Sequence, residues 1–265
     1  MMAGETLGEV HTDSALPDLD FIRDALFLDI DGTMIDIAPT PESVVVPESL
    51  KLSLSRLQEL SGGALALSSG RTIPSIDELF APLKLVAAGC HGAEIRLDPK
   101  GKFEQLATPM TAVEKAGLAK IAKIDPRLRA EDKIYTFAIH YRSAPELQDE
   151  LSGMVTQWVT NVGRDLEIIF GKMVIEIKPP GFNKGTGLRH MMQHAPFAGR
   201  RPIFLGDDTT DEDALAVLPE FGGLGISVGL RRLSGAARFV DLPRDVRRWL
   251  ASLTGVDMDL ARRDA

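Results

Sequence analysis

Four segments of the chain share one pattern, in which a short unbroken run of apolar residues ends abruptly in a polar cluster. They are residues 25–33, 63–71, 84–94 and 201–213. Apolar runs without alternation are typical of strands that are buried on both faces, as in parallel sheets covered by helices. Because each polar cluster follows its strand, we expect these clusters to meet at the carboxyl edge of the sheet, where open α/β folds bind ligands.

Helical patterns alternate with these strands. Apolar residues recur at helical spacing over 47–60, from Ser75 to about residue 83, and from Asp211 to about residue 221. Strands that alternate with helices are typical of the α/β class. The pattern therefore predicts a doubly wound, Rossmann-like core built on a parallel sheet.

The middle of the chain has a different pattern. It contains helix-like stretches at 112–124 and 146–159, an alternating strand at 133–142 and a hairpin at 166–179. Strict alternation indicates that one face of this sheet is solvated, unlike the strands of the core. We therefore predict an inserted α+β domain, placed over the crevice as a cap.

Proline and glycine suit the hinges at both ends of this insertion, near Pro109 and at "KPPG". The predicted organisation is a flexible N-terminal arm (1–20), a core (21–108 and 180–265) and a cap (109–179).

Composition narrows the class of protein. With 265 residues and 44% hydrophobic content, the chain suits one large or two small domains with a proper core. No apolar run approaches the roughly 20 residues that span a bilayer, and residues 1–20 lack the basic start and apolar centre of a secretory signal. The single cysteine, Cys90, fits a reducing compartment. We therefore expect a cytoplasmic protein.

The net charge of −8 argues against a nucleic-acid surface. It does not exclude an anionic small-molecule substrate, because a bound cation can reverse the local field. No protein partner is implied, so a small molecule is the expected partner.

Two carboxylates at the end of the first strand, in "LFLDIDGTMID" (26–36), raise a chemical question. Asp29 is a candidate nucleophile toward a phosphate monoester, provided that a cation cancels the repulsion between the two anions. Mg²⁺ suits this role, since it takes carboxylate oxygens and bridges phosphate oxygens. Asp31 would protonate the leaving alkoxide and later deprotonate the attacking water. The alternative is a capped turn without function.

The segment "GDDTTDED" (206–213) places several acids after another buried strand. Such crowding is repulsive without a counter-ion, which favours a metal site. Asp207 is the expected metal ligand, and Asp211 would orient ligands or waters around it. Alternatively, the acids could stabilise the start of a helix through its dipole.

Two further segments could bind the phosphate group. Ser69, Gly70 and Arg71 offer a hydroxyl, a backbone N–H and a close approach, although a helix cap is equally compatible with this segment. Lys184 could place a point charge on the phosphate and on the developing transition-state charge. Alternatively, it could be an ordinary solvent-facing lysine.

Taken in order, Asp-x-Asp-Gly-Thr, Ser-Gly-Arg, Lys and Gly-Asp-Asp resemble the four motifs of the haloacid dehalogenase superfamily of phosphatases. The resemblance covers roughly residues 22–255 and implies a haloacid dehalogenase-like core. The insertion between the second and third motifs is similar to the α/β cap of the sugar-phosphatase branch.

Finer features resemble the trehalose-6-phosphate phosphatase family. They are "CHGAEIR" (90–96), "HYR" (140–142), "VIEIKP" (174–179), "NKG" (183–185) and "GDDTTDED" (206–213). The resemblance implies Asp29 as nucleophile, Asp31 as acid/base, and Ser69 and Lys184 as phosphate holders. It also implies Asp29, Asp31 and Asp207 as Mg²⁺ ligands.

For the cap, the resemblance implies that three residues reach the sugar hydroxyls, namely Glu131, Lys133 and Glu176. Further candidates are His91, Glu94, Arg142 and Glu212. His91 could instead satisfy a backbone carbonyl, and Lys133 and Arg142 could lie on the solvated face of their strand.

The resulting hypothesis is Mg²⁺-dependent hydrolysis of trehalose 6-phosphate through an aspartyl-phosphate. The alternatives are a phosphatase of another sugar phosphate, such as sucrose 6-phosphate or mannosyl-3-phosphoglycerate, a phosphosugar mutase, and a non-catalytic sugar-phosphate sensor.

Overall fold

The computed structural model describes residues 16–38, 44–171 and 173–258. Its core is an eight-stranded sheet with the order β12-β11-β10-β1-β2-β3-β4-β5. The strands are β1 (Asp24–Leu28), β2 (Leu65–Ser68), β3 (Val86–Gly89), β4 (Glu94–Arg96), β5 (Glu104–Gln105), β10 (Arg201–Gly206), β11 (Leu224–Val228) and β12 (Arg238–Val240). The neighbours from β12 to β3 pair in parallel, whereas β4 and β5 add an antiparallel edge.

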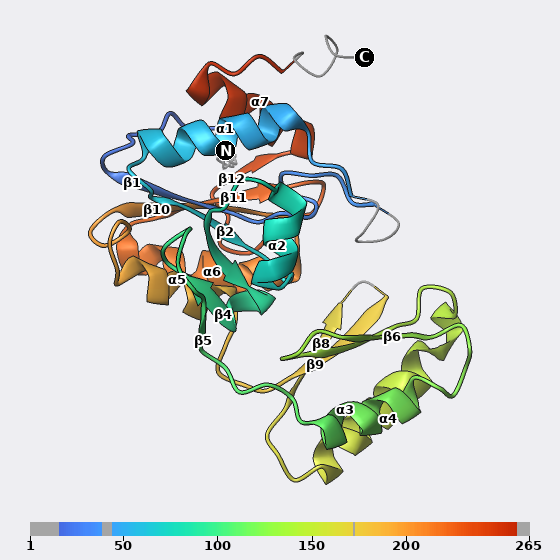
Figure 1. Ribbon diagram of the computed structural model, residues 1–265. Helices are drawn as coiled ribbons and strands as arrows, with labels where there is room; N and C mark the ends of the chain where they lie inside the picture. Colours follow the sequence, from blue (N-terminus) through green and yellow to red (C-terminus); the bar gives the residue numbers. More distant parts are fainter. Residues whose placement is uncertain (1–15, 39–43, 172, 259–265) are drawn as a thin grey trace, which may run out of the picture.

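Helices cover both faces of this sheet (Figure 1). They are α1 (Glu48–Leu60), α2 (Ile73–Phe80), α5 (Lys184–Met192), α6 (Thr209–Val217) and α7 (Pro243–Thr254). Alternate residues of β1 explain the two layers: Leu26 and Leu28 pack with α1, α2 and α7, whereas Ala25 and Phe27 pack with α5 and α6. All five residues of β1 are buried, which confirms the prediction of strands buried on both faces.

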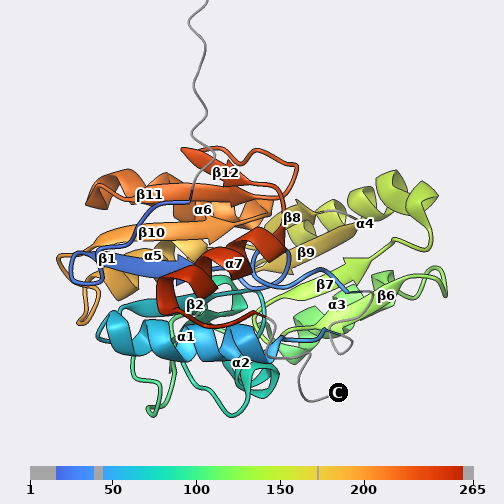
Figure 2. The same cartoon turned by 90° about the horizontal axis from the view of Figure 1, so that it is seen from above.

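A second, antiparallel sheet with the order β6-β7-β9-β8 forms the cap. Its strands are β6 (Arg129–Asp132), β7 (Phe137–His140), β8 (Glu167–Gly171) and β9 (Val174–Lys178), and its helices are α3 (Ala112–Ile121) and α4 (Gln148–Asn161). The helices cover one face only, through a separate hydrophobic cluster that includes Phe137, Ile139, Ile175 and Ile177. The other face of the sheet is turned toward the core (Figures 1 and 2).

Two connections join core and cap: the segment from β5 to α3 and the segment from β9 to α5. A third contact is made by the turn between β6 and β7. There, Tyr135 is fully buried in a cluster with Cys90, Ala93 and Phe182. The cap is therefore joined to the core by two chain connections and by one packing contact.

Most of the predicted N-terminal arm, residues 1–15, lies outside the described residues. The described part packs on the core, since Leu16 and Leu19 contact the hydrophobic cluster and the carbonyl of Pro17 accepts a hydrogen bond from Trp249 Nε1 at 2.9 Å. Within the described part of the chain, no helix is long and apolar enough to cross a bilayer.

Candidate active site

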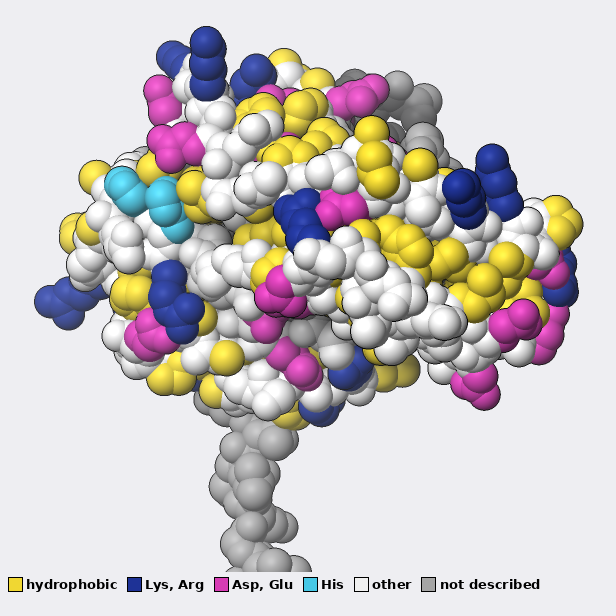
Figure 3. Space-filling model, turned by 90° about the horizontal axis from the view of Figure 1, so that it is seen from below, with side chains coloured by type: hydrophobic (Ala, Val, Ile, Leu, Met, Phe, Trp, Pro, Cys, Tyr) yellow, Lys and Arg dark blue, Asp and Glu magenta, His cyan; other side chains and the backbone are white. Residues whose placement is uncertain are grey.

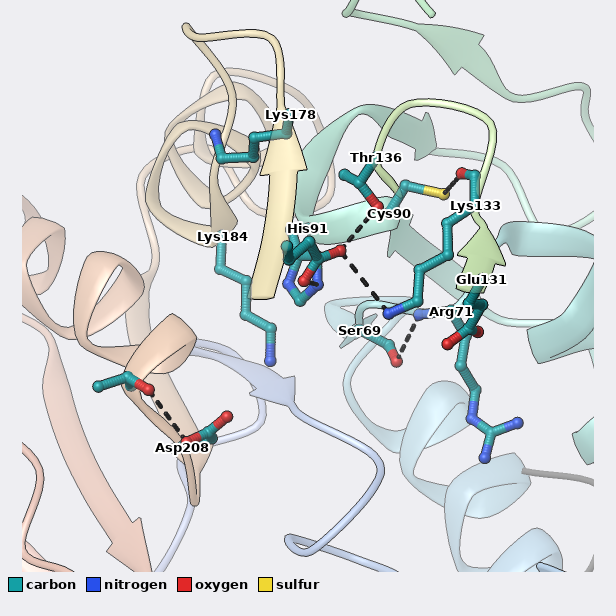
Figure 4. A network of polar contacts seen from close by, with 12 residues as sticks. Ser69, Arg71, Cys90, His91, Glu131, Lys133, Thr136, Lys178, Lys184 and Asp208 are labelled. Carbon is teal, nitrogen blue, oxygen red and sulfur yellow. Dashed lines mark hydrogen bonds and ion pairs between the residues drawn. The ribbon is translucent and has the colours of Figure 1, made fainter. Parts of the chain in front are cut away.

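A cavity of about 490 Å³ lies between the carboxyl ends of the core strands and the open face of the cap sheet. Both parts contribute polar side chains to its wall (Figure 4). From the core come Asp29, Asp31, Ser69, Gly70, Arg71, His91, Lys184, Asp207 and Asp211, and from the cap come Glu131, Lys133, His140 and Glu176. The structure therefore brings together most of the residues predicted from the sequence.

The predicted nucleophile and the predicted lysine form a buried pair. Asp29 follows the end of β1 and is 5% exposed, and its Oδ1 accepts a hydrogen bond from Lys184 Nζ at 2.7 Å. Burial raises the pKa of Asp29 well above its usual value, and Lys184 opposes that rise. Burial alone would lower the pKa of Lys184, but Asp211 and Asp29 raise it above its usual range. Lys184 is therefore a fixed positive charge beside Asp29.

The Asp211 carboxylate accepts three hydrogen bonds from its neighbours in this cluster. Its Oδ1 accepts a hydrogen bond from Lys184 Nζ at 2.6 Å, and its Oδ2 accepts the backbone N–H groups of Asp207 and Asp208 at 3.0 Å each. Asp211 is fully buried. A carboxylate that is satisfied by three donors is suited to orienting its neighbours, which is the role that the sequence predicted for it.

The predicted acid/base, Asp31, is held by an arginine. Arg71 Nε and Nη2 donate to the two Asp31 oxygens at 2.7 Å each, which is the bidentate geometry that arginine favours with carboxylates. Arg71 was predicted to bind substrate. In the structure it lies at the cavity wall and fixes Asp31.

Three carboxylates could hold a metal ion. Ligand atoms of Asp29, Asp207 and Asp211 lie within 4.8 Å of one another. Burial raises the pKa of Asp207 to about 6, and Asp211 adds to that rise, so a bound cation would favour the ionised form of these acids. Asp31, predicted as a further ligand, is not in the group, because its carboxylate faces Arg71.

Gly32 explains how the first motif fits against Asp207. Its φ of +87° lies in the region that favours glycine, and a Cβ at this position would collide with the Asp207 carboxylate. Thr33 Oγ1 donates to Asp207 Oδ1 at 3.3 Å. The Asp-x-Asp-Gly-Thr segment is thus shaped to bring Asp29 and Asp207 together.

The segment predicted to bind phosphate lies directly before α2. The Ser69 hydroxyl accepts the Arg71 N–H at 3.1 Å, and Ser69 is 2% exposed. A Cβ on Gly70 would lie 2.6 Å from His91 Nε2, so the imidazole occupies the space that glycine leaves. Thr72 is the N-cap of the helix, so the cap and the cavity wall are built by consecutive residues.

His91 connects this segment to the cap. It has a φ of +56° and follows Cys90 with a φ of +49°, so both residues adopt a conformation that costs free energy outside glycine. Burial lowers the pKa of His91 to about 4, with Lys184 and Lys133 contributing. Its Nε2 lies 3.9 Å from Glu176 Oε2. Figure 4 shows His91 and Lys184 approaching the cavity from the core and Lys133 approaching it from the cap.

Glu176 is the centre of a small network in the cap. Its Oε1 accepts a hydrogen bond from Thr136 Oγ1 at 2.6 Å and lies 3.6 Å from Lys133 Nζ. Burial alone would raise the pKa of Glu176, but its charged and hydrogen-bonding neighbours lower it. Glu176 is therefore a buried acceptor at the wall of the cavity.

Glu131 has a partner that the sequence interpretation missed. His140 Nε2 lies 2.8 Å from Glu131 Oε2, and both residues line the cavity. The alternating pattern of β7 could have indicated this residue. Phe137 and Ile139 face the cap helices, so His140 belongs to the opposite face of the sheet.

Three predicted substrate-binding residues are not among the described residues that line the cavity. Arg142 is exposed in the turn that follows β7. Glu94 is 1% exposed and accepts the Ile73 N–H at 2.9 Å, so it supports the start of α2. Glu212 accepts the Ser234 N–H at 3.1 Å on the core surface. The carboxylates of Glu94 and Glu212 therefore have structural partners in the core instead.

One outer face of the molecule carries charged side chains of both signs. On the face in Figure 3, basic and acidic side chains are interspersed over the described residues rather than gathered by sign.

The chain is similar to several known proteins. The family model described as trehalose-phosphatase matches residues 27–237. The chain is 39% identical over 232 residues to the trehalose-6-phosphate phosphatase of Escherichia coli K12, covering 87% of this chain and 86% of that one. It is 43% identical over 224 residues to a probable trehalose-phosphate phosphatase of Sinorhizobium fredii, covering 84% and 83%.

A solved structure of the C-terminal domain of trehalose-6-phosphate phosphatase from C. albicans has the same fold. The TM-score is 0.75 at 22% identity, and the match covers 93% of this chain and all of that one. The predicted haloacid dehalogenase-like core with an inserted cap is confirmed. The chain therefore belongs to the trehalose-phosphatase family and is a phosphoric monoester hydrolase.

Proposed function

We propose that the protein hydrolyses trehalose 6-phosphate to trehalose and phosphate through an aspartyl-phosphate on Asp29, with Mg²⁺ as cofactor. One observation carries the proposal: a single cavity joins the Asp29, Lys184 and Asp207 cluster of the core to the polar face of the cap. The names of the two bacterial relatives support the choice of sugar.

In the first step, a carboxylate oxygen of Asp29 forms a bond to phosphorus while the bond from phosphorus to the sugar oxygen breaks. Asp31 gives a proton to the leaving sugar oxygen. Lys184, held 2.7 Å from Asp29, faces the charge that develops on the phosphoryl oxygens. Because its ammonium is already fixed by two carboxylates, little reorganisation is needed.

In the second step, water attacks phosphorus, Asp31 takes its proton and the bond to Asp29 breaks. The bidentate contact with Arg71 fixes the Asp31 carboxylate beside the cavity. In each step Arg71 would keep one hydrogen bond while the other Asp31 oxygen handles the proton. Both steps thus use the same carboxylate, first as an acid and then as a base.

The carboxylates of Asp29, Asp207 and Asp211 suit a divalent cation that prefers oxygen ligands, such as Mg²⁺. Asp29 and Asp207 would hold it, and Asp211 would orient them through its own hydrogen bonds. When bound, Mg²⁺ would neutralise negative charge between the carboxylates and the phosphate.

The cap would select the sugar. Glu131, Lys133 and Glu176 line the cavity opposite the core cluster and offer acceptors and a donor to sugar hydroxyls. Specificity would then depend on a few polar contacts that lose their partners when the wrong sugar is bound.

The test is a substrate panel. Phosphate release is measured with trehalose 6-phosphate, sucrose 6-phosphate, glucose 6-phosphate and mannosyl-3-phosphoglycerate, with Mg²⁺ or with EDTA, and with Asp29→Asn as the blank. We expect Mg²⁺-dependent turnover with a strong preference for trehalose 6-phosphate. Preference for another sugar would overturn the substrate proposed here, and binding without phosphate release would favour a sensor.

A further inference from the structure

The open face of the cap sheet carries its side chains in rows that run across the strands. The middle row joins Glu131, Ala138, Glu176 and Ile169, since each of these residues is the register partner of the next. The neighbouring row, one step further along β7, joins Arg129, His140, Val174 and Gly171. Glu131, His140 and Glu176 line the cavity from these two rows.

The two carboxylates of the middle row are separated by one strand. Two strand spacings place the backbones of Glu131 and Glu176 about 9–10 Å apart, and the residue between them, Ala138, has only a methyl group. Glu176 lies beside His91, which packs on Gly70 of the phosphate-binding segment. Glu131 is therefore the carboxylate that lies two strand spacings further from this segment along the row.

Glu131 is held by a diagonal contact. Its direct register partner, Ala138, offers no donor, but His140 lies two residues along β7 and reaches Glu131 Oε2 at 2.8 Å. Diagonal neighbours on a sheet face are within reach of long side chains. Because an ionised carboxylate can only accept, His140 Nε2 must carry the proton and donate it.

The exposure of the pair distinguishes it from the catalytic cluster. The side chains of His140 and Glu131 are 33% and 29% exposed, whereas those of Lys184 and Asp29 are 3% and 6% exposed. The His140 hydrogen bond is also the largest cause of the lowered pKa of Glu131, with Lys133 and Arg129 contributing. Glu131 is thus an ionised acceptor that is still open to a ligand.

We propose that His140 is a positioning residue for substrate selection: it fixes the Glu131 carboxylate as the acceptor for hydroxyls of the sugar unit farther from the phosphate. A disaccharide phosphate would reach this acceptor, whereas a monosaccharide phosphate would not. The inference rests on the proposed function, because it assigns part of the same cavity to the second sugar.

The test compares His140→Ala, His140→Gln and Glu131→Ala with the wild type and with His194→Ala, a matched control on the surface. The steady-state constants kcat and KM are measured for trehalose 6-phosphate and for p-nitrophenyl phosphate, which has no sugar. Glucose 6-phosphate is added as a substrate or, if it is not turned over, as a competitive inhibitor. Thermal melting checks that each variant is folded.

We expect His140→Ala to lower kcat/KM for trehalose 6-phosphate about tenfold, mainly through KM, as for loss of a hydrogen bond to a charged group. The constants for p-nitrophenyl phosphate and glucose 6-phosphate should stay within about twofold of the wild type. His140→Gln, which keeps an N–H donor, should restore part of the loss. In the Glu131→Ala background, His140→Ala should have little further effect.

Equal losses with all three compounds would overturn the proposal, since they would indicate a structural role. Additive losses in the double variant, or no loss in His140→Ala, would also overturn it. If the wild type releases phosphate from p-nitrophenyl phosphate but not from trehalose 6-phosphate, the proposed function fails and this inference fails with it.

A second readout does not depend on turnover. The chain has five histidines, so ¹⁵N NMR of the imidazoles at pH 8 can assign the tautomer of His140. We expect the proton on Nε2 in the wild type and a changed Nε2 resonance in Glu131→Gln. A proton on Nδ1 would contradict the proposed contact.

Discussion

The core and the cap line the same cavity, but they hold their charged side chains differently. In the core, Asp29, Lys184 and Asp211 are almost completely buried and joined by contacts of 2.6–2.7 Å. In the cap, Glu131 and His140 keep about a third of their side-chain surface exposed. The difference agrees with two tasks: phosphoryl transfer needs a preorganised, dry cluster, whereas sugar recognition needs donors and acceptors that a ligand can reach.

The two arrangements also differ in how their charged side chains tolerate substitution. Buried charges are tolerated only when they are paired, because removal of one partner leaves an uncompensated charge. Each carboxylate that contacts Lys184 therefore depends on it, and changes in the core should affect every substrate. Changes on the cap face should affect mainly substrates that carry the sugar.

The largest effect is expected for Asp29→Asn. The amide is a far weaker nucleophile, so turnover of trehalose 6-phosphate and of p-nitrophenyl phosphate should both fall by about 10⁴-fold or more. Lys184 keeps its contact with Asp211, so the fold should persist. Phosphate release and thermal melting measure the two effects.

The control is Asp165→Asn, which changes the same group at an exposed position of the cap and should leave both activities unchanged. Retention of more than about 1% of activity in Asp29→Asn would contradict the nucleophile, given the size of covalent contributions to catalysis.

Metal removal should have the next largest effect. EDTA should lower turnover of both substrates by at least about 10²-fold, with recovery on addition of Mg²⁺. Asp207→Asn should raise the Mg²⁺ concentration needed for half-maximal activity, because the half-buried Asp207 carboxylate belongs to the acidic group. Activity that is unchanged in EDTA, or a variant with an unchanged Mg²⁺ requirement, would exclude the assigned ligands.

A smaller effect is expected for the dependence of stability on pH. The pKa of His91 falls from 6.5 to about 4 in the folded protein, so the unfolded state binds a proton in that interval and the folded state does not. The free energy of unfolding should therefore decrease as the pH falls from about 6.5 to about 4, by up to about 3 kcal/mol from this group.

Urea unfolding at pH 7.5, 6 and 5 measures this contribution. His91→Gln should reduce the slope of stability against pH by up to about one proton, whereas His194→Gln, at an exposed position, should keep the wild-type slope. Identical slopes in all three proteins would show that His91 does not titrate as inferred.

The sequence predicted the core better than the cap. The core residues follow buried strands, so their positions at one sheet edge are a consequence of topology. The short strands β4, β5 and β6 were missed because they are two to four residues long, and the sequence of β6, Arg-Ala-Glu-Asp, has no apolar period. The pair of Arg71 with Asp31 spans 40 residues, and no local pattern indicates such a contact.

In the cap, the alternating pattern correctly predicted the strand but not its limits. The strand β7 ends at His140, so Arg142 lies in a turn and does not continue the face of the sheet. Glu94 was placed with the substrate because of its neighbours in sequence, although its carboxylate binds the first N–H of α2. Whether a polar side chain lines the cavity or binds a backbone group depends on tertiary packing, which the local sequence does not show.

The division of tasks between core and cap is tested most directly by Glu176→Gln. The ratio of kcat/KM for trehalose 6-phosphate to that for p-nitrophenyl phosphate is compared with the wild type and with Glu104→Gln, an exposed control on β5. We predict that Glu176→Gln lowers this ratio about 10- to 100-fold, through the sugar substrate alone, and that Glu104→Gln leaves it unchanged. Equal losses for both substrates would contradict the account.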